Sequence, residues 1–92
     1  MPARREVIAL TIYSRPGCHL CDEMKAVLQR VAAGGNVTIA EFDISTDPAL
    51  QNLYGLEIPV LLINGKKVAK YRITEDALRR ALQGAGMAGG AG

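Results

Sequence analysis

Two cysteines separated by two residues are the feature of this chain with the clearest chemical meaning. Cys18 and Cys21 lie in residues 15–21 (RPGCHLC), directly after an apolar run that predicts a strand. A helix that begins near Cys18 places this thiol among unpaired backbone N–H groups, which stabilise a thiolate. Cys21 follows one turn later, close enough to attack a mixed disulfide formed on Cys18. The spacing therefore predicts thiol–disulfide exchange, with Cys21 as the more buried thiol.

Two further residues carry positive or potentially positive charge beside the first cysteine. Arg15 precedes Cys18 by three residues, and His19 follows it directly. Positive charge near a thiol lowers its pKa, so both side chains are candidates to activate Cys18. Each can also be an ordinary solvated residue. We expect Arg15 to assist the thiolate and to anchor an anionic substrate, and we leave the role of His19 open.

Other uses of the two cysteines give different expectations. A structural zinc site needs four ligands, whereas the chain offers two thiols and one histidine, which lies between them. We therefore expect no metal bound within one chain. A role as plain core residues does not suit Cys18, which lies at a helix start among polar residues. The alternative function is an iron–sulfur cluster held between two chains through Cys18.

The hydrophobic pattern predicts the elements that position these residues. Residues 7–13 and 59–63 are almost wholly apolar, so they predict central strands. Residues 37–44 and the lysine-rich residues 66–72 predict peripheral strands. Apolar residues at helical spacing predict three helices, and the short middle one is expected to turn Leu50, Leu53 and Tyr54 inward. The expected fold is α/β, a four-stranded mixed sheet with helices on both faces in the order βαβαββα. The expected strands cover residues 7–13, 37–44, 59–63 and 66–72, and the expected helices cover residues 18–32, 48–54 and 75–82.

Turn and cap residues support these boundaries. Asp47 before Pro48 is typical of a helix N-cap followed by proline in the first turn. Asn64-Gly65 is a strong signal for a two-residue hairpin, because both positions of such a turn need a positive φ. Thr74 is expected to cap the last helix.

Length and composition limit the chain to one small domain. The 92 residues are 49% apolar and 22% charged, with a net charge of +2, which is typical of a globular protein. We expect a domain over residues 1–83 and a flexible Gly/Ala-rich tail over residues 84–92. The mild charge does not predict nucleic-acid binding, and no apolar run is long enough to predict a membrane span or a secretory signal. We therefore expect a cytoplasmic protein.

These motifs together resemble a known family. Residues 13–21 (YSRPGCHLC), 57–60 (EIPV) and 63–65 (ING), in the order βαβαββα, are similar to a glutaredoxin-like protein of the thioredoxin-fold superfamily. The resemblance covers about residues 7–82. It implies a thioredoxin-like fold and a thiol–disulfide oxidoreductase that reduces protein disulfides or glutathione mixed disulfides. It also implies that Cys18 is the attacking thiol and Cys21 the resolving thiol.

The resemblance gives Pro59 a role that its position alone does not. It implies that the Ile58–Pro59 bond is cis and faces the cysteine pair, and that the backbone of Ile58 pairs with an extended substrate segment. No tightly bound cofactor is implied. Glutathione or a reductase would restore the dithiol, and we expect a monomer.

A glutathione site is a further expectation from the resemblance. It implies that Thr74 and Asp76 meet the amino group of glutathione and that Arg15 or Arg72 meets a carboxylate. Glutathione-binding members usually carry a Gly-Gly pair after the last strand. The corresponding stretch of this chain has no such pair and contains Tyr71 and Arg72.

Overall fold

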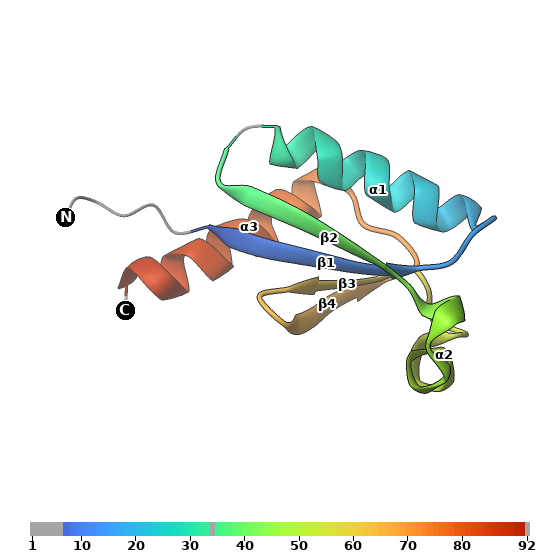
Figure 1. Cartoon of the computed structure of the whole chain (residues 1–92). Coiled ribbons are helices and arrows are strands. Elements are labelled where there is room, and N and C mark those ends of the chain that lie inside the picture. Colours follow the sequence, from blue (N-terminus) through green and yellow to red (C-terminus); the bar gives the residue numbers. More distant parts are fainter. Residues whose placement is uncertain (1–6, 34, 92) are drawn as a thin grey trace.

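The computed structural model describes residues 7–33 and 35–91, so the first six residues of the expected domain lie outside the description. The elements follow one another in the order βαβαββα, with a short 3₁₀ turn, η1, before the second helix (Figure 1). This order confirms the expected fold class. The strands are β1 (Ile8–Ser14), β2 (Val37–Asp43), β3 (Val60–Ile63) and β4 (Lys66–Lys70), and the helical elements are α1 (His19–Ala32), η1 (Ile44–Thr46), α2 (Pro48–Tyr54) and α3 (Glu75–Ala91).

The four strands form one mixed sheet in the spatial order β2-β1-β3-β4. β1 pairs parallel with β2, while β3 is antiparallel to both β1 and β4. The two nearly continuous apolar segments therefore occupy the centre, as predicted, and every residue of β3 is buried. The lysine-rich β4 lies at an edge, where charged side chains discourage pairing with another chain.

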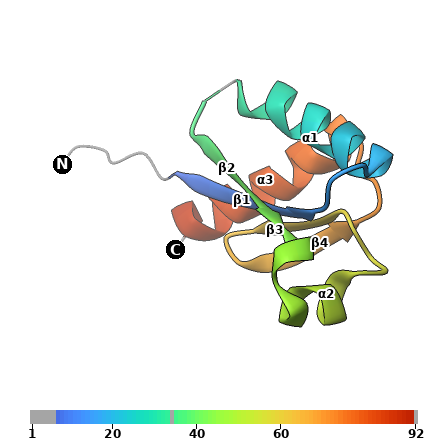
Figure 2. The ribbon, with the colours of Figure 1, turned by 45° about the vertical axis from the view of Figure 1, so that its right-hand side comes forward.

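The main core fills the space between one face of the sheet and two helices. Leu10 and Ile12 of β1 pack with Leu61 and Ile63 of β3 against α1 and α3. α2 lies on the opposite side of the sheet from α1, near the end where β1 and β2 terminate (Figure 2). The buried residues of this core are Leu10, Ile12, Met24, Leu28, Val31, Leu61, Ile63 and Leu78.

The predicted turns and caps form as expected. Asn64 and Gly65 both have positive φ, at 51° and 85°, and the Asn64 side chain accepts a hydrogen bond from the Ala9 backbone at 3.0 Å. The Asp47 carboxylate caps α2, and the Thr74 hydroxyl accepts from the Ala77 backbone at 3.0 Å to cap α3. These contacts fix the ends of the elements that surround the cysteines.

Two expectations differ from the structure. Leu53 does not point inward; it is 65% exposed, because the seven-residue α2 packs through Leu50 and Tyr54 only. The last helix continues to Ala91 and does not end near Gln83, so residues 84–91 are helical. The flexibility of residues 84–92 stays a prediction.

Among residues 7–33 and 35–91, no helix has both the length and the apolar character needed to cross a membrane.

Candidate active site: a disulfide at the start of a helix

Cys18 and Cys21 form a disulfide at the start of α1, with their Cα atoms 5.2 Å apart. Cys18 is the N-cap residue, with extended backbone angles (φ −97°, ψ 110°), and its Sγ accepts a hydrogen bond from the Cys21 N–H at 3.1 Å. Gly17 precedes it at φ 78°, a conformation that glycine adopts at no steric cost. The sulfur of Cys18 therefore occupies the place where a helix offers free N–H groups to an anion, as predicted.

The two sulfurs lie in different surroundings. Cys21 is 1% exposed and packs with Ile44 and Ile58, whereas Cys18 is partly exposed at the edge of this group. The half-buried rings of Tyr13 and Tyr54 stack at 4.9 Å between centroids and cover the same group. One thiol of the reduced pair would therefore be open to a substrate and the other enclosed.

The proline loop, which connects α2 to the central strand β3, borders the cysteine pair. The Ile58–Pro59 peptide bond is cis, and Ile58 belongs to the buried group around Cys21. The Pro59 carbonyl accepts a hydrogen bond from the Tyr71 backbone at 2.8 Å, which ties the loop to the end of β4. The side chain of Tyr71 donates its hydroxyl proton to the Leu56 carbonyl at 3.0 Å.

Tyr71 lies in the stretch where the family resemblance implies a Gly-Gly pair. Its φ is +69°, in the left-handed region that favours glycine, and its hydrogen bonds to Pro59 and Leu56 hold it there. Tyr71 therefore adopts a backbone conformation that favours glycine, although it carries a bulky phenol side chain. Arg72 follows and reaches Glu23 of α1 at 3.8 Å.

The predicted site residues fall into two groups. Arg15 lies in the loop before Cys18, and Ile58, which precedes Pro59, packs in the buried group of Cys21, so these three belong to the segments next to the disulfide. Thr74 lines a hollow of about 500 Å³ between α1, β4 and α3, whereas Asp76 lines a separate surface hollow farther along α3. Thr74 and Asp76 therefore line different hollows, and their contact with glutathione stays a prediction.

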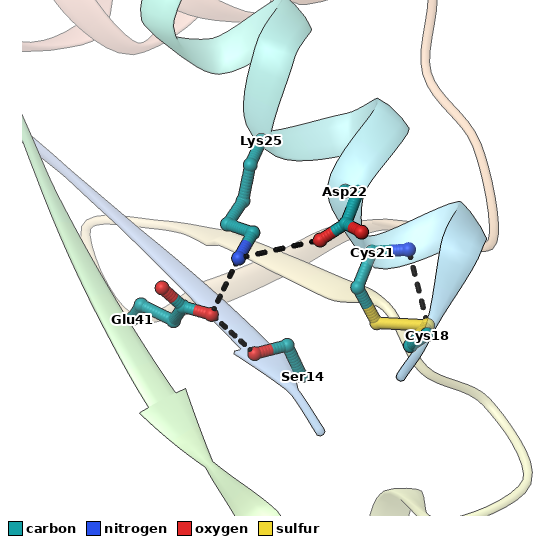
Figure 3. Close-up of polar contacts among 6 residues, drawn as sticks. All are labelled: Ser14, Cys18, Cys21, Asp22, Lys25 and Glu41. Atoms are coloured by element: carbon teal, nitrogen blue, oxygen red, sulfur yellow. Dashed lines mark hydrogen bonds and ion pairs between the residues drawn. A yellow bond between two sulfur atoms is a disulfide. The ribbon is translucent and has the colours of Figure 1, made fainter. Parts of the chain in front are cut away.

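A polar group beside Cys21 was not predicted from the sequence. The Ser14 hydroxyl donates to the Glu41 carboxylate at 2.7 Å, and the Lys25 ammonium donates to the same oxygen at 3.0 Å (Figure 3). Lys25 also lies 3.6 Å from Asp22. We call Ser14, Asp22, Lys25 and Glu41 the inner polar cluster. A serine buried at the end of a central strand is the one sequence signal that could have indicated it.

Hydrogen bonding shifts the ionisation of this cluster. The hydroxyl of Ser14, and then the ammonium of Lys25, hold the pKa of the Glu41 carboxyl below its ordinary value. The hydrogen bond to Glu41 in turn raises the pKa of Lys25. Both groups are therefore charged at neutral pH.

A small cavity of about 130 Å³ lies between this cluster and the loop that leads to Cys18. The cavity is wide enough for ordered water and has several polar partners for it. Within residues 7–33 and 35–91, no three His, Cys, Asp or Glu side chains lie together as metal ligands do. The residues that line the cavity are Ser14, Arg15, Pro16, Gly17, Asp22, Lys25, Glu41 and Asp43.

A disulfide at the start of the first helix of a four-stranded mixed sheet defines a class, the thioredoxin fold with a close cysteine pair that fits a redox role. A sequence profile of the glutaredoxin-like domain (DUF836) matches residues 9–83. The chain therefore belongs to this glutaredoxin-like family of the thioredoxin superfamily.

Two individual proteins are similar to this chain over most of its length. The chain is 31% identical over 77 residues to the glutaredoxin-like protein YDR286C homolog of Dictyostelium discoideum, an alignment that covers 77% of this chain and 71% of that protein. The X-ray structure of protein XcR50 from X. campestris is 34% identical, covers 82% of this chain and 96% of its own, and superposes with a TM-score of 0.71.

A more distant likeness concerns the fold alone. A mutant thioredoxin from Halobacterium salinarum superposes with a TM-score of 0.65 at 23% identity, covering 86% of this chain and 74% of that one.

Proposed function

We propose that this protein is a thiol–disulfide oxidoreductase that reduces protein disulfides or glutathione mixed disulfides through Cys18 and Cys21. The observation that carries the proposal is the unequal placement of the two sulfurs. Cys18 caps α1, accepts an N–H hydrogen bond and is partly exposed, whereas Cys21 is buried one turn later. This arrangement gives one accessible thiolate and one enclosed thiol within bonding distance.

The proposed reaction has two exchange steps. The Cys18 thiolate attacks one sulfur of the substrate disulfide and forms a mixed disulfide, and the displaced thiolate takes up a proton. Cys21 then loses its proton and attacks the Cys18 sulfur, which releases the second substrate thiol and leaves the Cys18–Cys21 disulfide. Two electrons and two protons from glutathione or a reductase restore the dithiol. These exchange steps need no tightly bound cofactor. We propose that the protein carries them out as a monomer in the cytoplasm.

Helix α1 supports the first step electrostatically. The N-terminal N–H groups of a helix favour an anion, and the Cys21 N–H already contacts the Cys18 sulfur in the oxidised form. Arg15 lies in the loop directly before the helix and adds a positive charge to this region. The thiol pKa of Cys18 in the reduced protein should therefore lie below that of a free cysteine.

Substitution of each cysteine separately tests the proposal. Cys18→Ser should reduce the rate of disulfide reduction to the uncatalysed level, because the attacking sulfur is gone. Cys21→Ser should retain the first step and accumulate a mixed disulfide, which mass spectrometry detects as an adduct of the substrate mass. Equal residual rates in the two variants would contradict the assigned roles.

The substrate class is tested with the same proteins. Rates with a glutathione mixed disulfide and with a protein disulfide should be measured with and without glutathione as reductant. If Tyr71 obstructs the glutathione site, Tyr71→Gly should accelerate reduction of the glutathione substrate more than that of the protein substrate. Equal acceleration of both would place Tyr71 outside glutathione recognition.

A further inference from the structure

The inner polar cluster lies on the same side of α1 as the buried thiol. Cys21 and Lys25 are four residues apart on this helix, so their Cβ atoms are about 5–6 Å apart. Figure 3 shows the Lys25 ammonium and the Glu41 carboxylate on the flank of α1 toward which Cys21 points. The ammonium contacts two carboxylates, at 3.0 Å to Glu41 and 3.6 Å to Asp22. The two carboxylates therefore neutralise the positive charge of Lys25, which weakens its electrostatic effect on the Cys21 thiol.

The wider surroundings of Cys21 add little positive charge. Three carboxylates and two cations line the cavity between this cluster and the loop that leads to Cys18, so the negative charges outnumber the positive ones. The buried group in which Cys21 lies also contains Ile44 of η1, Ile58 of the proline loop, Tyr13 of β1 and, from α2, Leu50 and Tyr54. Its remaining member is Cys18, whose thiolate in the reduced protein places a negative charge beside Cys21 and so also favours the neutral form of Cys21.

Glu41 is not suited to accept the proton of Cys21. Its carboxyl has a lowered pKa and receives hydrogen bonds from Ser14 and Lys25, so it is a weak base for a thiol. Its fixed negative charge, in contrast, acts at every pH at which the protein works. The cluster therefore has an electrostatic effect on Cys21 without taking part in proton transfer.

We propose that the inner polar cluster holds Cys21 in its neutral thiol form by neutralising Lys25, so that Cys18 alone is a thiolate in the reduced protein. Glu41 is then a positioning residue whose charge determines how the two thiols differ. Burial of Cys21 acts in the same direction, because an anion is poorly solvated there. The role assigned to this difference rests on the proposed function; the ionisation itself does not.

Thiol titration in the Cys18→Ser background isolates Cys21. Thiolate absorbance or the pH dependence of iodoacetamide alkylation gives the Cys21 pKa without coupling to the second thiol. Adding Glu41→Gln should lower this pKa by roughly 0.5–1 unit, because Lys25 loses its main partner and its charge then reaches the thiol. Adding Lys25→Met should raise the pKa by a similar amount. In the variant that carries both Glu41→Gln and Lys25→Met, the Cys21 pKa should return close to its value in the Cys18→Ser parent.

Opposite shifts distinguish this electrostatic effect from simple damage. Loss of structure around Cys21 would move the pKa in one direction in both single variants, and that result would overturn the proposal. Glu23→Gln is the matched control, because Glu23 lies on the same helix but faces Arg72 and the other hollow. It should leave the Cys21 pKa unchanged. A shift equal to that of Glu41→Gln would mean that net charge alone is responsible.

A second measurement covers the case in which the Cys18→Ser background does not fold. The reduced protein with both cysteines should ionise in two steps, and Glu41→Gln should bring these steps closer together. An unchanged interval would refute the proposal. None of these titrations requires turnover, so a protein that fails to reduce disulfides but shows the predicted shifts would contradict the proposed function alone.

Discussion

The part of the chain that the structure describes contains two buried groups that share helix α1 but differ in size and composition. The main core joins one face of β1 and β3 to α1 and α3 and is built from aliphatic side chains and one methionine. The group around the disulfide is smaller: Cys21, Ile44 and Ile58 are buried, and half-buried Tyr13 and Tyr54 cover them. Most of the apolar area that stabilises the fold therefore lies away from the sulfurs.

Helix α1 connects the two groups. Met24, Leu28 and Val31 fix the helix to the main core, and the first turn of the helix presents the disulfide at its free end. The residues of α1 that hold the helix in place therefore differ from the residues of α1 that react with disulfides. Changes in the main core should affect the free energy of unfolding, whereas changes in the disulfide group should affect the reactivity of the sulfurs.

The largest effect is expected from Leu61→Ala in the main core. Leu61 is fully buried, and its truncation should lower the free energy of unfolding by about 2–5 kcal/mol, as other Leu→Ala substitutions in cores do. Urea unfolding measures this cost, and Val68→Ala on the exposed surface of β4 is the control, with less than about 1 kcal/mol. Under conditions in which the variant is folded, the alkylation rate of Cys18 should be unchanged. A large change in that rate would break the separation between the two groups.

A matched pair of smaller substitutions compares the groups directly. Ile44→Val and Ile63→Val each remove one buried methylene, from the disulfide group and the main core respectively, at a cost of about 0.5–1.5 kcal/mol. Ile44→Val should also increase the rate at which dithiothreitol reduces the disulfide, roughly two- to five-fold or about 0.4–1 kcal/mol in activation energy. Looser packing admits water to Cys21, which must leave as a thiolate. Ile63→Val should leave this rate unchanged, and equal rates for the two variants would contradict the comparison.

Much of this arrangement is readable from local sequence. The apolar runs that became β1 and β3, the Asn64-Gly65 turn and the Thr74 cap depend on residues close together in the chain, so their prediction succeeded. The placement of Cys18 at the helix start follows from the same local pattern. Each of these features is fixed by backbone preferences that act within a few residues.

Two features that depend on contacts between distant segments were not predicted. Glu41 reaches Ser14 across 27 residues because β1 and β2 pair in parallel, in a register that places Ser14 opposite Asp43 and Ile12 opposite Glu41. No local pattern specifies that register. The left-handed backbone of Tyr71 likewise depends on its hydrogen bonds to the distant Pro59 and Leu56, because the residue type itself argues against it.

The smallest expected effect is the pH dependence that Glu41 gives to stability. Its pKa in the folded protein lies below the ordinary value of 4.5, so the folded state binds this proton less readily than the unfolded chain does. The resulting stabilisation is complete above the unfolded pKa and is lost as the pH falls through the folded one. Lys25, whose pKa is raised, stays charged over this range and does not change the sign.

Glu41→Gln should therefore cost less than about 1 kcal/mol at pH 7, because the carboxylate is 45% exposed and solvent weakens its ion pair. The difference from the wild type should shrink as the pH falls below about 4, where both proteins carry a neutral side chain at this position. Urea unfolding at pH 7, 5 and 3 measures this difference in the free energy of unfolding. Asp43 is a separate acid whose pKa is lowered by the hydroxyl of Ser45. The same comparison in an Asp43→Asn background removes its contribution. If Glu41→Gln costs more than Ile63→Val and the cost persists in acid, the inner polar cluster belongs to the structural core. Stability and thiol chemistry would then share the same residues, and the division between the two buried groups would fail.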